Sequence, residues 1–282
     1  MKKNALISLL FLCFSSKNMH AQLHPVCGNT PEWKIAGSDA NLPERKQAFE
    51  ARVAKAIGQG NWITTRSPMT IPVVVHVLWN KPEENIDDAR IWSQIERLNA
   101  DFNAENTDLD QVPDEFKTLV GNSGIHFCLA NEAPDGRPAN GIIRKHTDIR
   151  GIASKPDLIY YSVLGGSDAW DTERYLNIWV ADNTPEPGSF SVTGYSTFPW
   201  NENRTNSGVV ISLATFGKNN SESWSLGRVA VHEVGHYLGL RHTWGDDIPP
   251  SCDDDDGISD TPGQFFYYYG CPDAPQQSRS EE

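Results

Sequence analysis

The chain has 282 residues, of which 22% are charged and 10% aromatic, and its formal net charge is -13. This length and composition suit one enzyme domain with something smaller beside it, and they exclude a disordered chain. The acidic balance argues against nucleic acid as a partner, because both would be negatively charged. Beyond the N-terminus no segment is long and apolar enough to span a membrane, so no membrane anchor is expected.

Residues 1–21 have the pattern of a secretory signal peptide. A basic start precedes an apolar run at 5–14 that is too short to span a bilayer, and cleavage is expected after Ala21. A lipoprotein signal would use Cys13, but bulky Leu12 stands directly before it. We therefore expect a secreted, extracellular protein, with the periplasm as the alternative, in which disulfide bonds can form.

Residues 22–66 differ in composition from the rest of the chain and are interpreted as a pro-segment, followed by a catalytic domain at 67–282. The pro-segment contains a Cys27-Gly28 pair and a helical stretch at 44–57. The apolar residues on one side of that stretch are Phe49, Val53, Ala56 and Ile57.

Apolar periodicity predicts the elements of the larger domain. Strands are expected at 71–78, 124–130, 175–180 and 208–211, and a helix at 86–102 that begins at Asp87 or Asp88. A second long helix begins near residue 226. Strands combined with two long helices indicate an α/β (α+β) fold, with the helices packed behind the sheet.

The second helix carries the most specific motif of the chain, H-E-V-G-H-Y-L-G-L-R-H at 232–242. His232 and His236 are four residues apart, so they share one helix face and can bind one metal ion. Gly239 permits the positive φ that ends the helix, and the turn would bring in His242 as a third ligand. Three protein ligands leave a fourth position open, as in catalytic zinc sites. Glu233 lies one step around the helix, within reach of a water molecule in that position.

A bare H-E-x-x-H pattern also arises by chance, as two solvated histidines on a helix, but the longer form fixes five positions. This longer motif resembles that of the metzincin metalloproteases, and the flanking segments resemble the pappalysin family among them. Those segments are I-P-V-V-V-H-V-L at 71–78, Y-L-N-I-W-V at 175–180, L-G-R at 226–228 and G-I-S-D-T-P at 257–262.

The resemblance implies a secreted zinc endopeptidase made as a latent zymogen. The implied fold has a twisted mixed sheet and two long helices in an upper subdomain, above an irregular lower subdomain. His232, His236 and His242 would bind one catalytic zinc ion, and Glu233 would be the general base that activates a zinc-bound water to hydrolyse peptide bonds. Protein or peptide substrates would lie along an edge strand, which we expect near Cys128 or in the segment that follows it.

The resemblance also implies a role for Cys27. In the latent form its thiolate would occupy the open zinc position, which makes the pro-segment an intramolecular inhibitor until a cut near Arg66 removes it. The alternatives are a disulfide bond, for example between Cys27 and Cys128, and a free thiol.

The acidic run that ends at Asp256 resembles a family loop that binds structural calcium, with Asp256 and Thr261 as the side-chain candidates. The alternative is a solvated acidic loop. A methionine-containing turn and two further cysteines of the family are not found before Glu282, so we expect that the chain is truncated. Cys252 and Cys271 are expected to form disulfide bonds whose partners stay open.

Two other functions compete with the endopeptidase. One is a non-catalytic secreted module that binds zinc and a peptide or protein, and the other is a zinc hydrolase that acts on other bonds. The presence of Glu233 favours the peptidase, because zinc binding alone does not require this residue.

Overall fold

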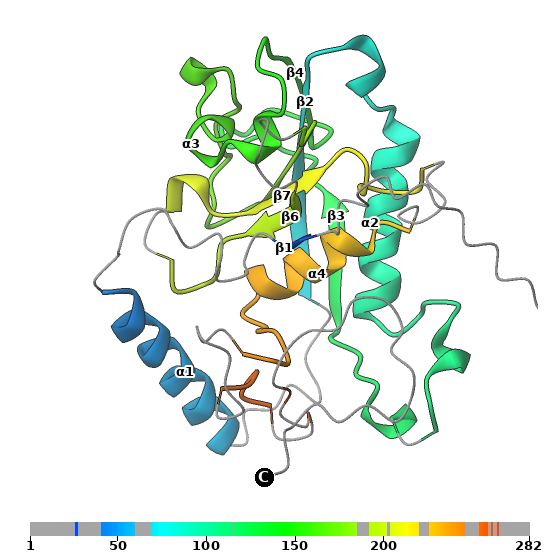
Figure 1. Ribbon diagram of the computed structural model, residues 1–282, viewed down its shortest axis with the longest axis vertical. Coiled ribbons are helices and arrows are strands. Elements are labelled where there is room, and N and C mark those ends of the chain that lie inside the picture. The colour runs from blue at the N-terminus through cyan, green and yellow to red at the C-terminus, as the bar shows by residue number, and fades with distance from the viewer. Residues whose placement is uncertain are drawn as a thin grey trace, which may run out of the picture.

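The computed structural model describes residues 26–27, 41–59, 69–114, 116–184, 192–201, 204–219, 226–245, 254–258, 261 and 264. The expected signal peptide, the cut near Arg66, Cys252 and Cys271 lie outside this part of the chain. The described part contains a seven-stranded sheet, and the helices α2 (Asp88–Phe102) and α4 (Arg228–Tyr237) pack against one of its faces (Figure 1). None of the helices among these residues is both long and apolar enough to cross a bilayer.

The strands follow the spatial order β1-β6-β7-β5-β2-β3, and β4 pairs with the second half of β2. Their bounds are Val26–Cys27 (β1), Met69–Trp79 (β2), Ile125–Leu129 (β3), Ile142–His146 (β4), Leu176–Ala181 (β5), Val192–Ser196 (β6) and Val209–Ser212 (β7). All pairings are parallel except that of β6 with β7. The mixed sheet agrees with the expected fold class.

Two further α-helices are α1 (Leu42–Gly58) and the short α3 (Pro156–Ile159). The 3-10 helices are Pro82–Glu84, Leu109–Gln111, Lys117–Leu119, Ile152–Ser154, Ser162–Leu164 and Arg204–Asn206. The strands expected at 71–78, 124–130, 175–180 and 208–211 are confirmed as β2, β3, β5 and β7. No pattern in the sequence predicted β1, β4, β6 or α3.

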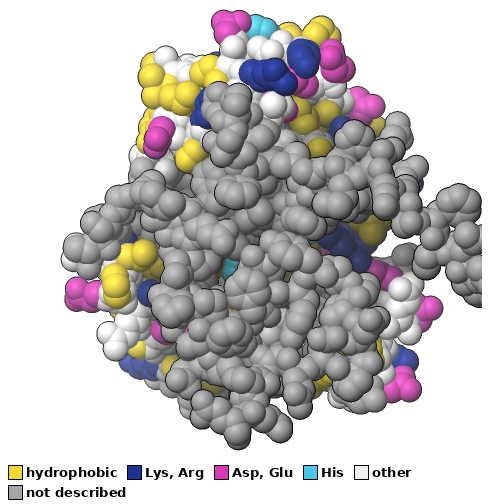
Figure 2. Space-filling model, in the orientation of Figure 1, with side chains coloured by type: hydrophobic (Ala, Val, Ile, Leu, Met, Phe, Trp, Pro, Cys, Tyr) yellow, Lys and Arg dark blue, Asp and Glu magenta, His cyan; other side chains and the backbone are white. Residues whose placement is uncertain are grey.

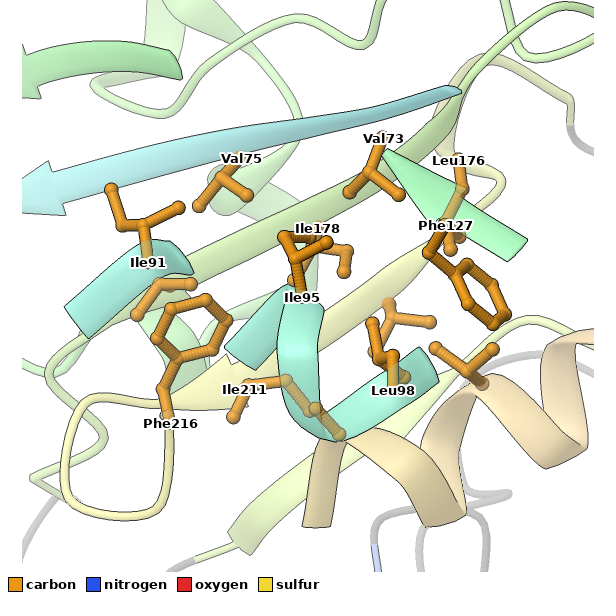
Figure 3. Packing of buried hydrophobic residues seen from close by; sticks show 14 of the residues in the cluster. Val73, Val75, Ile91, Ile95, Leu98, Phe127, Leu176, Ile178, Ile211 and Phe216 are labelled. Carbon is orange, nitrogen blue, oxygen red and sulfur yellow. The ribbon is translucent and has the colours of Figure 1, made fainter. Parts of the chain in front are cut away.

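The main core lies between the sheet and α2. Asp87 caps α2, since its side chain accepts a hydrogen bond from the backbone N–H of Arg90 at 2.9 Å. Ile91, Ile95 and Leu98 recur at helical spacing and point toward the sheet (Figure 3). Their partners on the sheet face include Val73, Val75, Leu176, Ile178 and Ile211. Burial of this apolar stripe fixes α2 as the support on which α4 also packs.

The start of α4 is tied to α2 by polar contacts. Arg228 donates two hydrogen bonds to Asp108, at 2.6 and 2.7 Å, and a third to Asp101 at 3.0 Å. This pairing raises the pKa of Arg228 and lowers that of Asp108. The fully buried Gln94 donates to the carbonyl of Gly227 at 2.9 Å and accepts from Gly217 N–H at 2.7 Å. These contacts fix where the helix that carries the histidine motif begins.

A buried polar network crosses the opposite face of the sheet, and His76 is its centre. Nε2 of His76 donates to the side-chain oxygen of Asn177 at 3.0 Å, because that oxygen can only accept. Nδ1 of His76 then accepts from the hydroxyl of Ser167 at 2.9 Å. The imidazole stacks on Trp179, with centroids 5.0 Å apart. Every polar atom of the ring is satisfied while His76 is neutral.

Burial makes this network sensitive to pH. Desolvation lowers the pKa of His76 from 6.5 to about 4, against a smaller opposing effect of the hydrogen bond with Asn177. Between these two values the unfolded chain binds a proton that the folded protein does not, so stability falls as the pH falls. The slope is about 1.4 kcal/mol per pH unit.

We expect the free energy of unfolding of the protein to decrease by about 3 kcal/mol from pH 6.5 to pH 4 because of His76 alone. In His76→Gln the amide can still donate to Asn177 but does not titrate, so this share of the pH dependence should disappear. Urea unfolding followed by tryptophan fluorescence at several pH values measures the difference. An unchanged slope in the variant would show that His76 is not the titrating group.

Candidate metal site

Three histidines converge at the end of α4. Nε2 of His236 lies 3.0 Å from Nε2 of His232 and 3.0 Å from Nε2 of His242. All three ligand atoms lie within 4.8 Å of one another. His236 and His242 are each 3% exposed, whereas His232 is exposed. The motif therefore forms one cluster of nitrogen atoms that opens toward solvent on the side of His232.

The turn after α4 brings His242 back to the helix. Gly239 has a φ of 105°, which a residue with a side chain rarely adopts. Gly239 N–H donates to the carbonyl of His236, and Leu240 N–H to that of Gly235, each at 2.9 Å. The expected left-handed turn at Gly239 is thus present, and it ends the helix between the second and third histidines.

The same turn orients the second histidine. Nδ1 of His236 lies 2.8 Å from the carbonyl oxygen of Leu240, which can only accept, so Nδ1 carries the proton. In the neutral ring this leaves the lone pair on Nε2, which faces the other two histidines. A backbone carbonyl that fixes the tautomer of a histidine is typical of metal ligands.

The geometry fits a tetrahedral metal ion. Metal–nitrogen distances of about 2.0–2.1 Å imply nitrogen atoms roughly 3.3 Å apart, close to the observed spacing. Although part of the His232 side chain is exposed, its ring lies among the other site residues, and this desolvation, followed by repulsion from His236, lowers its pKa to about 4. Neutral imidazole is the form that binds zinc. The ring of His242 stacks on Trp244, with centroids 4.4 Å apart, and this contact holds the third ligand in place.

A cavity of about 630 Å³ adjoins the cluster. It is bounded by α4, by the end of α2, and by the loop segments 121–123 and 240–244. All three histidines lie in its wall, together with Asn122, Leu240 and Trp244. The three histidines therefore face a space large enough for part of a peptide.

Glu233 is fully buried and lies against β6. A Cβ atom at Gly194 of β6 would stand 2.9 Å from Cγ of Glu233, and 3.0 Å from Cγ1 of Val229. Such contacts are too short for a real side chain, so the glycine makes room for the stem of Glu233. The position of this carboxylate thus depends on an element that the sequence analysis missed.

The edge of the sheet beside α4 is formed by β6 and β1. The backbone of Cys27 in β1 pairs with Gly194, the residue that adjoins Glu233. Cys128 lies in β3, which is the other end of the strand order. The edge that adjoins the histidine helix is therefore β6, not the strand near Cys128 where we expected a substrate.

This topology also excludes the disulfide bond between Cys27 and Cys128. Five strand spacings of about 4.8 Å separate their strands, roughly 24 Å in all. A disulfide bond requires Cα atoms within about 7 Å. Cys128 is exposed and is a free cysteine.

The acidic loop is described only in part. Asp256 accepts a hydrogen bond from the N–H of Ile258 at 2.9 Å, and Thr261 N–H donates to the carbonyl of Ile258 at 3.1 Å. Asp254 pairs with Arg241 at 2.6 Å. Through these hydrogen bonds Asp256 and Thr261 both contact the backbone of Ile258.

Comparisons with known proteins agree with this site. Residues 163–267 match the peptidase family described as pregnancy-associated plasma protein-A, the pappalysin family. An extracellular metalloprotease of Verticillium alfalfae is 32% identical over 233 residues, which are 80% of this chain and 68% of the relative. One of Arthroderma otae is 27% identical over 210 residues, 73% of this chain and 63% of the relative. The chain thus spans less than two thirds of some of these curated relatives.

Two solved structures extend the similarity to the fold. Mature mirolysin of Tannerella forsythia, in complex with a cleaved peptide, is 43% identical with a TM-score of 0.70, over 75% of this chain and 78% of that one. A mutant of promirolysin from the same organism is 38% identical with a TM-score of 0.69, over 86% and 82% of the two chains. By its similarity in sequence and in fold, the chain belongs to the pappalysin family of metalloproteases.

Proposed function

We propose that the protein is a secreted zinc endopeptidase that is made as a latent zymogen. The proposal rests on one observation. The Nε2 atoms of three histidines converge at the end of α4, and the same helix carries the buried Glu233. His232, His236 and His242 would hold the zinc ion. When bound, zinc supplies Lewis acidity, which polarises a carbonyl group and makes water a stronger acid.

Glu233 acts as the general base. It follows the first ligand in the sequence, and its stem is confined between α4 and Gly194 of β6. From there it removes a proton from the attacking water and delivers it to the leaving amine. A buried carboxylate that is held by packing keeps its position during both transfers, which is the property that proton transfer needs.

A peptide substrate would bind along β6. This strand adjoins α4, and its outer side is the one on which β1 pairs. Strand addition supplies backbone hydrogen bonds that do not depend on the substrate's side chains. The cleaved peptide in the mirolysin complex supports a peptide as the substrate class.

Residues 22–66 would block the site before activation. With β1 on β6, a substrate cannot add to the same edge. The pairing of Cys27 with Gly194 supports a position of the cysteine near the metal site, where its thiolate would take the open zinc position. The existence of a pro-form of mirolysin supports a zymogen. A cut near Arg66 would release the whole segment.

We also propose that the turn at Asp256 and Thr261 binds structural calcium, because a hard cation prefers carboxylate, hydroxyl and carbonyl oxygens. Cys252 and Cys271 are proposed to stabilise the same region through disulfide bonds. The extracellular relatives support export of the protein.

Zinc binding gives the first test. The purified protein should retain one equivalent of zinc after dialysis, and His236→Ala should retain much less. His146→Ala is the matched control. The side chain of His146 is half-exposed and belongs to β4, a strand that is distant from the histidine cluster. Atomic absorption measures the metal content, and circular dichroism shows whether each variant is folded. Full zinc content in folded His236→Ala would remove this residue from the ligand set.

Activity gives the second test. Glu233→Gln should bind zinc as the wild type does but cleave peptides about 10²–10⁴-fold more slowly, the usual contribution of a general base. Glu96→Gln, on the exposed side of α2, serves as the control and should keep the wild-type rate. Cleavage of a quenched fluorescent peptide library, after removal of the pro-segment, measures both. Equal rates in the wild type and Glu233→Gln would refute the mechanism.

Latency gives the third test. Cys27→Ser, combined with Arg66→Ala to prevent processing there, should cleave peptides faster than the Arg66→Ala chain but more slowly than the processed enzyme, because the thiol is lost while β1 still covers β6. Cys128→Ser with the same Arg66→Ala change should stay latent, because Cys128 is at the far edge of the sheet. Activity is measured on the uncut chains, whose length is verified by mass spectrometry. If both double variants are equally latent, the thiol does not control activity.

A further inference from the structure

The pro-segment helix α1 is only partly covered by the rest of the protein. None of its residues is buried, and Val53 and Ile57 are 42% and 44% exposed. The helix lies at the lower left of the molecule in Figure 1, and hydrophobic side chains show at the surface in this region (Figure 2). Part of the predicted apolar side of this helix is therefore exposed, and Phe49 is the residue of that side whose contacts with other described residues are closest.

Phe49 fills a small hollow formed by Trp200, Pro199 and Gly239, which we call the aromatic hollow. The rings of Phe49 and Trp200 are tilted by 58° with centroids 5.4 Å apart. A Cβ atom at Gly239 would lie 3.0 Å from Cζ of Phe49 and 3.5 Å from Cγ of Pro199. The hollow thus admits the edge of a phenyl ring because the turn glycine of the metal motif has no side chain.

Two polar contacts hold α1 over the hollow. Arg45, one helical turn before Phe49, donates from Nε to the carbonyl oxygen of Trp200 at 2.8 Å. Glu50 lies 3.4 Å from the guanidinium of Arg241, the residue before the third histidine. Glu50 is 47% exposed, and an exposed pair of this kind contributes little. The ring of Phe49 is the principal apolar contact of the helix.

The aromatic hollow is continuous with the metal site. The ring of Phe198 stacks on Trp200, with centroids 4.5 Å apart. The same ring also contacts His236, with centroids 5.1 Å apart. Phe198 and Trp200 lie in the short segment after β6, which ends at Ser196 and is the proposed substrate strand. A side chain of a peptide on β6 can therefore enter the hollow once α1 has left it.

We propose that the aromatic hollow is a substrate subsite that takes an aromatic side chain, and that Phe49 occupies it in the latent protein as an internal substitute. This inference rests on the proposed peptidase function and extends it to a substrate class, peptides with Phe, Tyr or Trp at one fixed distance from the cut. The phenyl ring of Phe49 shows the shape that fits, and Trp200 provides the surface for tilted ring contacts. The loss of α1 with the pro-segment then both relieves inhibition and opens the subsite.

The test is a set of peptides cleaved by the protein after removal of its pro-segment. In this set each position around one cleavage site carries either Phe or Ala. We expect one position at which Phe raises kcat/KM about tenfold or more over Ala, as contacts in an apolar pocket do. Pro199→Asp should reduce this ratio, because an exposed proline is replaced by a carboxylate beside the hollow.

Trp200→Ala should also reduce the ratio of kcat/KM for Phe over Ala. Trp92→Ala, on an exposed site of α2, should leave both this ratio and the rate of cleavage unchanged. If peptides are cleaved but no position prefers Phe, the subsite is refuted and the peptidase stands. The subsite is refuted as well if Pro199→Asp and Trp200→Ala, both folded, keep the preference. If the zinc-loaded protein cleaves no peptide, the proposed function fails first, and the subsite fails with it.

Discussion

The metal site depends on the turn at Gly239. A chain that continued as a helix would carry His242 around to another face, away from His232 and His236. The positive φ of Gly239 turns the chain back toward the helix, and the carbonyl oxygen of Leu240 then accepts a hydrogen bond from Nδ1–H of His236. One turn therefore brings His242 to the other two histidines and fixes the tautomer of His236. The absence of a side chain at this glycine also leaves room for the ring of Phe49.

The turn can position His242 only because the start of α4 is itself fixed by contacts. Its first residue, Arg228, is held by two carboxylates, and the buried Gln94 of α2 holds Gly227 directly before it. Charge-assisted bonds in a bidentate geometry are directional as well as strong, so they define where the helix starts. On its other side, β6 comes so close that only glycine fits at position 194. Contacts with α2 thus position the histidines, and the close approach of β6 positions the carboxylate of Glu233.

The sequence predicted the parts of this arrangement that are periodic. The apolar pattern of α2 and the continuous apolar runs of β2 and β5 identified these elements within two residues of their observed bounds. It could not predict β6, whose V-T-G-Y-S sequence is short and has a glycine in its interior, which is unusual in a strand. Because β6 was missed, the expected substrate edge was placed near Cys128 in β3, at the other end of the sheet from the strand that adjoins the histidine helix. The role of Gly194 follows from a contact across the sheet that no local pattern encodes.

In the proposed zymogen, the segment at 26–58 covers two separate parts of the site. The strand β1 pairs with β6 beside Glu233, and α1 places Phe49 on Trp200. Each contact is small. Once one of them has formed, the connecting chain keeps the other at a high effective concentration, so the two together bind the segment far more tightly than either would alone. After a cut beyond α1 the segment is no longer tethered to the domain, and this advantage is lost. A substrate that adds to β6 and also fills the aromatic hollow would compete for both contacts at once.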